Sequence, residues 1–171
     1  MLDPYALSLR VAERDFVIER RFAAAPARMF AMFTEPEHLM RWWAPQPYTV
    51  PACTVDLRPG GVWHYAMRSP EGQDHWARSV YTEVAPPERL AYTSTFADAD
   101  ANPIPGMPEH LTTVTFTGED GGTRVAARVQ FADADALRTA VALGMTEGLS
   151  MAWEALAAYV SASNPAGRAG A

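Results

Sequence analysis

The segment from Asp133 to Val160 carries a single apolar stripe that limits what the rest of the chain can fold into. Its large apolar side chains recur every three or four residues, at Leu137, Val141, Met145, Leu149, Trp153, Leu156 and Val160. This spacing predicts a long helix with one buried face, and with polar residues such as Thr146 and Glu147 on the opposite face. At about 1.5 Å per residue the helix would be roughly 40 Å long, enough to cross a whole sheet.

Six strand-like runs precede this segment, and turn sequences such as Pro59-Gly60-Gly61 separate them. In the last run, Val125, Ala127 and Val129 share one side of the strand, while Arg124, Arg128 and Gln130 take the other. Such alternation predicts an antiparallel sheet with one face buried and one face in water. The runs span about 49–57, 62–68, 75–84, 89–96, 111–117 and 123–131.

A seventh strand is predicted at residues 15–22, and two short helices follow it because Pro26 and Pro36 suit first helical turns. The predicted fold class is therefore α+β, with a curved seven-stranded antiparallel sheet wrapped around a long C-terminal helix. We expect one domain over 15–160. Residues 1–14 would form an N-terminal extension, either disordered or a short helix, and 161–171 a flexible tail.

Composition excludes several classes of mechanism and partner. All 14 basic residues among the 171 are arginine, which excludes a lysine nucleophile, and the net charge of −6 argues against nucleic-acid and membrane-surface partners. Cys53 is alone, so no internal disulfide forms. The sequence shows neither a signal peptide nor an apolar stretch of about 18–20 residues, so we expect a cytoplasmic protein that is not embedded in a membrane.

Signatures of catalysis and of phosphate or dinucleotide binding are absent from the sequence. The four histidines lie on different predicted elements without ligand spacing, so we expect no metal and no cofactor. His64 alternates with Trp63 and Tyr65 and is expected in solvent. His110 begins a strand beside Glu109, either at a cavity mouth or, by the favoured interpretation, on the surface.

Aromatic and methionine side chains exceed what a compact core of this size needs, and they suit the walls of an adaptable apolar pocket. Tyr65, Tyr92 and Ser94 would supply its polar groups. The alternative is that these residues only pack the core. The loop 98–108 could be a lid or a slack connection. The candidate ligand-binding residues are Trp42, Trp43, Trp63, Tyr65, Met67, Tyr92, Ser94, Met145, Leu149 and Trp153.

Four motifs occur in order along residues 15–160: Thr34-x-Pro36-x-x-Leu39-x-x-Trp42-Trp43, Asp56-x-Arg58-Pro59-Gly60-Gly61, Glu83-Val84-x-Pro86-Pro87 and Gly144-Met145-x-Glu147-Gly148. Together they resemble the activator-of-heat-shock-protein-ATPase-like branch of the START-like (SRPBCC) superfamily. The resemblance implies a helix-grip fold with a cavity between sheet and helix. The family usually places Trp directly after the last glycine; here Leu149 stands there, and Trp153 follows one turn later.

The superfamily hosts several functions, so the resemblance leaves more than one open. The leading hypothesis is binding of a small hydrophobic or amphipathic molecule. The second is an enzyme of the polyketide cyclase/dehydratase type, with His110 and Glu109, or Tyr65 and Tyr92, as its acid and base. The third is a co-chaperone-like ATPase activator. A homodimer is left open, and the lysine-free composition suggests a bacterial source.

Overall fold

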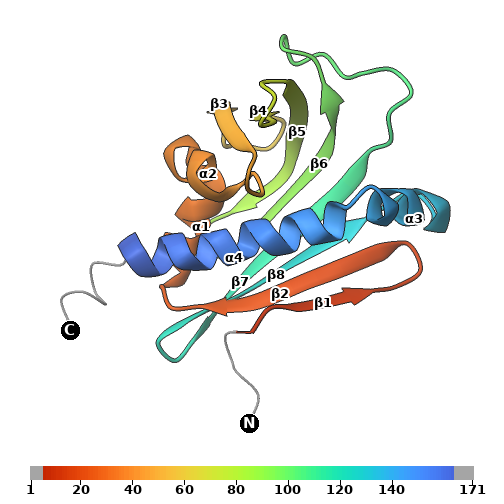
Figure 1. Cartoon of the computed structure of the whole chain (residues 1–171). Coiled ribbons are helices and arrows are strands. Elements are labelled where there is room, and N and C mark those ends of the chain that lie inside the picture. Colours follow the sequence, from red (N-terminus) through yellow and green to blue (C-terminus); the bar gives the residue numbers. More distant parts are fainter. Residues whose placement is uncertain (1–5, 164–171) are drawn as a thin grey trace.

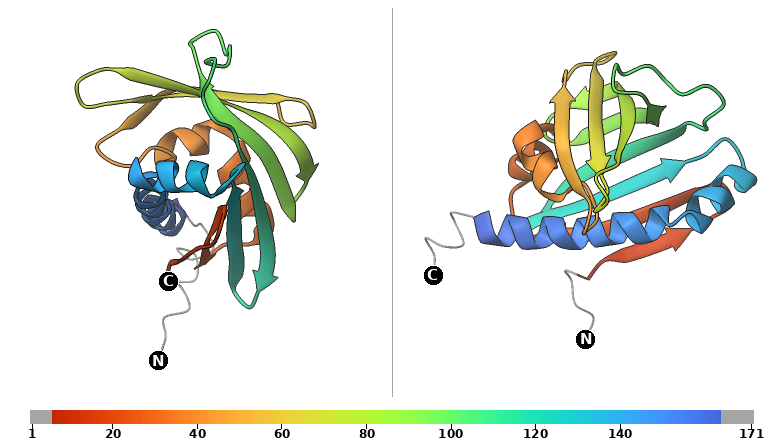
Figure 2. Two further views of the ribbon diagram at one scale, coloured as in Figure 1. Left: turned by 90° about the vertical axis from the view of Figure 1, so that its right-hand side faces the viewer. Right: turned by 45° about the horizontal axis from the view of Figure 1, so that its top comes forward.

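The computed structural model describes residues 6–163, in which helices cover one face of a single curved antiparallel sheet (Figure 1). The strand order is β1-β2-β8-β7-β6-β5-β4-β3. Figure 2 shows the sheet curving around the helices. The strands are β1 Ser8–Val11, β2 Asp15–Phe22, β3 Thr49–Val55, β4 Val62–Arg68, β5 Asp74–Ala85, β6 Arg89–Ala97, β7 His110–Glu119 and β8 Gly122–Gln130; the helices are α1 Pro26–Thr34, α2 Pro36–Trp42, α3 Ala134–Ala142 and α4 Met145–Ser163.

The α+β class and all seven predicted strands are confirmed, but the strand count is wrong because the sheet has eight. The additional strand β1 lies in the range expected to be disordered or helical. It pairs antiparallel with β2, from Ser8 opposite Glu19 to Val11 opposite Phe16. All four of its residues are exposed, so backbone pairing at the sheet edge forms the strand without the apolar alternation that would have predicted it.

The predicted C-terminal helix is two helices, because the chain turns between α3 and α4 at Gly144. This glycine has φ +92°, and the preceding Leu143 is 81% exposed. The Asp133 carboxylate accepts a hydrogen bond from the Ala136 amide at 2.8 Å and caps α3. Helix α4 continues to Ser163, so the expected tail begins inside it; residues 164–171 lie outside the described part of the chain.

The apolar stripe faces the sheet in both helices. Leu137, Trp153, Leu156 and Val160 are buried, and Val141, Met145 and Leu149 are half-buried. Thr146, expected on the wet face, is buried instead. The Arg20 guanidinium on β2 lies 2.6 Å from the Glu154 carboxylate, which ties the sheet to α4. No helix among residues 6–163 is long and apolar enough to cross a membrane.

The turn between β3 and β4 contains the predicted glycine with positive φ, since Gly60 has φ +83°. Its neighbour Gly61 is constrained by space: a Cβ there would lie 1.9 Å from the Asp56 carbonyl oxygen. Both glycines also bond to β5, because the Gly60 amide donates to the Tyr81 carbonyl at 2.7 Å and the Tyr81 amide donates to the Gly61 carbonyl at 3.0 Å.

We therefore expect Gly61→Ala to destabilise the domain more than Gly60→Ala. An alanine at position 60 meets open space and costs about 1–2 kcal/mol for its left-handed backbone. At position 61 the methyl group displaces backbone, which should cost more than about 3 kcal/mol. Urea denaturation measures both free energies of unfolding. Gly72→Ala, with φ +89° and open space, is the control; a Gly61→Ala cost no larger than this control would contradict the steric argument.

Candidate functional site

The inner face of the sheet, which is the face toward the helices, carries two adjacent rows of side chains fixed by the strand register. Alternation along each strand turns every second side chain inward. Pairing between strands then aligns these side chains across the sheet. The first row contains Trp63, Ser79, Ser94 and His110 on β4 to β7, and the second contains Cys53, Tyr65, Ala77 and Phe96 on β3 to β6.

An aromatic wall forms where these rows meet α2. The Trp63 ring centroid lies 4.6 Å from that of Trp43, 4.8 Å from that of Tyr65 and 5.4 Å from that of Tyr92. Trp42 lies directly behind, 5.3 Å from Trp43, and donates its indole N–H to the Met32 carbonyl at 3.0 Å. The structure thus brings together five of the predicted residues.

Small side chains line the inner face beside this wall. Ala77, Ser79, Ser94 and Thr112 are all buried. The Ser79 and Ser94 hydroxyls hydrogen-bond to each other at 2.7 Å. The inner face therefore carries small side chains next to the aromatic wall.

The helices cover this face incompletely at the end near α3. Phe96 points inward by its register with Ala77 and is still 45% exposed. Met67, His75 and His110 are inward and half-buried, as are Met145 and Leu149 on the helix side. Three more of the predicted residues, Met67, Met145 and Leu149, therefore lie where the inner face reaches solvent.

Burial keeps the phenols of the inner face uncharged. Desolvation raises the pKa of Tyr65 to about 12, against a smaller lowering by the Trp43 indole. Desolvation also raises the pKa of Tyr81 and Tyr92, and the pKa of the Cys53 thiol. Near neutral pH all three phenols therefore remain protonated and can donate hydrogen bonds.

Among residues 6–163 the buried Tyr81 hydroxyl has no hydrogen-bond partner, and the buried Trp63 indole nitrogen has only a weak one. The Cys53 thiol, a weak acceptor, is the polar group near Trp63. Leaving such a group unpaired in the interior costs about 1–3 kcal/mol. These atoms mark the site for an additional polar partner.

His110 lies on the inner face and is not the surface histidine that we favoured. Its ring is 5.5 Å from Phe131, and desolvation lowers its pKa to about 4. Glu109, the adjacent residue of the chain, is exposed, so the two side chains point apart and do not form the predicted acid/base pair.

Several expectations about the outer face also need correction. His64 is half-buried, stacks on Trp76 with ring centroids 4.6 Å apart, and bonds through Nε2 to the Asp98 carbonyl at 3.0 Å. Trp76 therefore belongs to the outer face. The loop 98–108 is anchored, because the Asp98 carboxylate accepts from the Asn102 amide at 2.9 Å and the Ile104 amide donates to the Phe96 carbonyl at 3.0 Å.

Sequence reasoning missed Cys53, Ser79, His75 and Thr112 as inner-face residues. The available signal was strand alternation, since Ala77, Ser79 and Tyr81 share one side of their strand. Trp153 is buried as predicted, but it packs deeper than the aromatic wall, 5.9 Å from Phe22 and 5.8 Å from Phe33. Its environment is that of a core residue.

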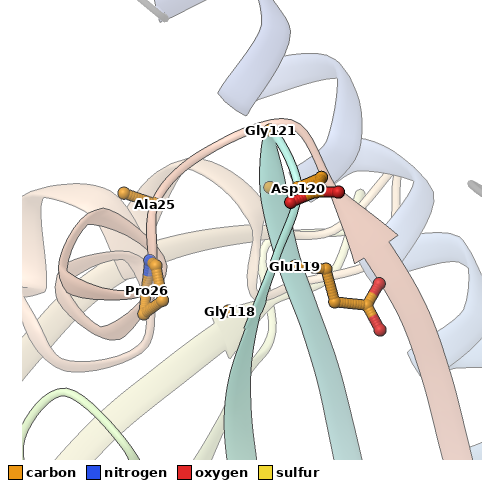
Figure 3. A pocket seen from close by; sticks show the side chains of 7 residues that line it. Ala25, Pro26, Gly118, Glu119, Asp120 and Gly121 are labelled. Carbon is orange, nitrogen blue, oxygen red and sulfur yellow. The ribbon is translucent and has the colours of Figure 1, made fainter.

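Two surface hollows lie away from the inner-face rows. One, of about 380 Å³, lies between the start of α1 and the β7–β8 hairpin and is lined by Pro26, Glu119 and Asp120 among others (Figure 3). The other, of about 280 Å³, lies between the end of β2 and α4 and is lined by Phe22 and Val160 among others. Neither is lined by a predicted ligand-binding residue, and the internal cavity stays a prediction.

Among the described residues, Glu35, Glu37 and His38 bring three potential metal-ligand atoms within 4.8 Å of one another. Both carboxylates are exposed. His38 Nδ1 is engaged with the Tyr159 hydroxyl at 2.7 Å, which fixes the ring against α4. Exposed carboxylates at a helix start are common without an ion, so this cluster is no evidence for a metal.

Comparison with known proteins places this architecture. The family model described as "Activator of Hsp90 ATPase homolog 1-like protein" matches residues 23–161. The chain belongs to this family. No curated protein matches the chain.

Several solved structures are similar to this chain over most of its length. Protein Ms6760 from Mycobacterium smegmatis is 30% identical, with a TM-score of 0.81, covering 93% of this chain and 98% of that one. Protein NE0264 from Nitrosomonas europaea is 26% identical, with a TM-score of 0.78, covering 89% and 97%. The AHSA1 protein from Silicibacter pomeroyi is 28% identical, with a TM-score of 0.69, covering 88% and 99%.

We expect Trp153→Ala to reduce the free energy of unfolding by about 3–5 kcal/mol, because it removes a fully buried indole from between two phenylalanine rings. Chemical denaturation measures the loss. Met151→Ala on the same helix is the matched control: Met151 is 51% exposed, so its change should stay within about 0.5 kcal/mol. A Trp153→Ala cost below about 1 kcal/mol would mean that the ring borders empty space.

The position of His110 predicts a stability loss in mild acid. The unfolded imidazole has its ordinary pKa of 6.5 and the folded one a pKa of about 4, so between these values the unfolded state binds more protons. The contribution of this imidazole to the free energy of unfolding is fully present above pH 6.5. It falls by on the order of 1–3 kcal/mol as the pH drops toward 4. His110→Gln should lose this part of the pH dependence. Denaturation of both proteins at pH 7.5 and pH 5 tests it; equal slopes would contradict a buried neutral His110.

Proposed function

We propose that this protein binds a small amphipathic molecule on the inner face of its sheet, between β4–β7 and the start of α4. The observation that carries the proposal is the combination of small residues, an aromatic wall and buried donors that lack a strong acceptor. A core that served only for packing would pair its polar atoms internally. The exposed inward ring of Phe96 supports an entrance at the end near α3.

Family membership supports the same function at a coarser level, because the fold is one that accommodates ligands. The family description mentions activation of the Hsp90 ATPase, and that activity is a property of the protein for which the family is named. The features of the inner face favour a small molecule over a protein partner, since they lie inside the curve of the sheet, where a side chain or a small molecule fits.

One observation favours an enzyme of the cyclase or dehydratase type as the second candidate. His110 is a neutral imidazole facing the proposed site, one strand from Ser94. A histidine with a strongly shifted pKa near a binding site is a candidate for proton transfer. Turnover of a bound substrate that is lost in His110→Gln, while binding is kept, would establish this function.

Filling the inner face tests the binding proposal. Ala77 lies between Tyr65 and Phe96, so Ala77→Leu projects a larger side chain into the proposed site. We expect Nile red, followed by fluorescence, to bind the native protein and to bind Ala77→Leu at least about tenfold more weakly. Thr95→Leu places the same side chain on the outer face of β6 and should leave binding unchanged.

A second measurement keeps this test informative if Ala77→Leu is unstable. In the native protein, Nile red should shift the NMR resonances of the Trp63 indole and the His110 ring. Binding that is unaffected by Ala77→Leu, or that shifts residues around the surface hollows instead, would contradict the proposed location.

A further inference from the structure

The pairing of polar groups on the inner face is selective. The Trp42 indole donates to the Met32 carbonyl at 3.0 Å, and the Ser79 and Ser94 hydroxyls bond to each other at 2.7 Å. The equally buried Tyr81 hydroxyl has no such partner in the described chain, and the Trp63 indole N–H meets only the Cys53 thiol, a weak acceptor. The fold therefore supplies strong acceptors for neighbouring donors, none for the Tyr81 hydroxyl and only a weak one for the Trp63 indole.

The Tyr81 and Trp63 side chains lie near the same ring, that of Tyr92. Tyr81 and Trp63 occupy adjacent strands, and the Tyr92 ring is 6.1 Å from the Tyr81 ring and 5.4 Å from the Trp63 ring. Cys53 is close enough to both to interact with them. A ligand that lies against the Tyr92 ring would therefore border both groups.

The charge of the surrounding face limits what that group can be. Apart from the phenols and Cys53, the chargeable inward side chains of the described strands are Arg20, His75 and His110. Arg20 is on the distant strand β2 and already binds Glu154. A carboxylate or ammonium beside Tyr81 would thus be buried without an opposite charge, which is costly.

The chemistry of the donors decides whether the uncharged ligand group donates or accepts hydrogen bonds. An indole N–H can only donate, and an uncharged phenol beside it can donate as well. Resting on the proposed binding function, we infer that the ligand presents an uncharged acceptor oxygen, a carbonyl above all, to the Tyr81 hydroxyl and the Trp63 indole N–H. The ligand class is a neutral, largely apolar ketone, ester or lactone.

Three naphthalene probes, with the variable group at the same ring position, test this inference by calorimetry: acetylnaphthalene, ethylnaphthalene and naphthoate. We expect the ketone to bind about tenfold more tightly than the hydrocarbon and the carboxylate to bind most weakly. Tyr81→Phe removes only the hydroxyl, so it should lower ketone affinity about five- to tenfold and leave hydrocarbon affinity unchanged. Tyr159→Phe, which removes a phenol hydroxyl on α4, is the matched control and should change neither.

The outcomes separate this inference from the proposed function. Equal affinity for ketone and hydrocarbon, insensitive to Tyr81→Phe, would overturn the inference, would mean that a buried water satisfies the donors, and would leave ligand binding intact. Tightest binding of naphthoate would also overturn it, by showing that the site takes an anion. If none of the three binds, both the inference and the proposed function fail.

Discussion

The contact between α4 and the curved sheet, made largely through Trp153, organises the rest of the structure. Its indole lies between Phe22 on β2 and Phe33 on α1, so one side chain joins the first strands, the short helices and the long helix. Phe33 in turn contacts Trp42 and Phe116. Because aromatic rings bury large areas and pack at defined angles, this cluster fixes where α4 crosses the sheet.

Closure at Trp153 leaves the opposite end of the inner face less covered. Helix α4 begins at Met145, and the turn at Gly144 directs α3 onto a second cluster formed by Phe16, Val129, Phe131 and Leu137. The rows beneath β4 to β6 receive neither helix fully, and Phe96 is left 45% exposed. The same helix break that completes the second cluster therefore accompanies the incomplete cover of the inner face at Phe96.

Strand alternation accounts for the parts of the fold that were predictable from the sequence. It located β4 at Val62–Arg68 without error, because the large residues Trp63, Tyr65 and Met67 alternate with smaller or polar ones. It missed β1, whose four residues are all exposed and carry no such pattern. The break between α3 and α4 was also missed: the stripe continues with a four-residue step from Val141 to Met145, and Gly144 occupies no stripe position.

The candidate site was predictable only in part because cross-strand register cannot be read from one strand at a time. Aromatic side chains on β4 and β6 were identified by residue type. Pairing between strands that are distant in sequence was not predictable in the same way, because no single strand encodes it. It brings Tyr81 opposite Tyr92, and Ser94 opposite His110 across the loop 98–108. Residue type alone likewise gave no reason to separate Trp153, a core residue, from Trp63, which belongs to the aromatic wall beside Cys53.

One physical cause links the stability of this face to the chemistry it can perform. Burial raises the pKa of the phenols and lowers the pKa of His110, and both shifts favour the uncharged form. The helices that create the core therefore also make the inner face polar without making it charged.

Such a surface orients a ligand through hydrogen bonds while its apolar walls supply most of the binding free energy. A charged ligand would need a counterion from the protein, and the inward arginine of the described strands, Arg20, is already paired with Glu154. The recognition by neutral donors that we propose would thus follow directly from how the sheet is closed.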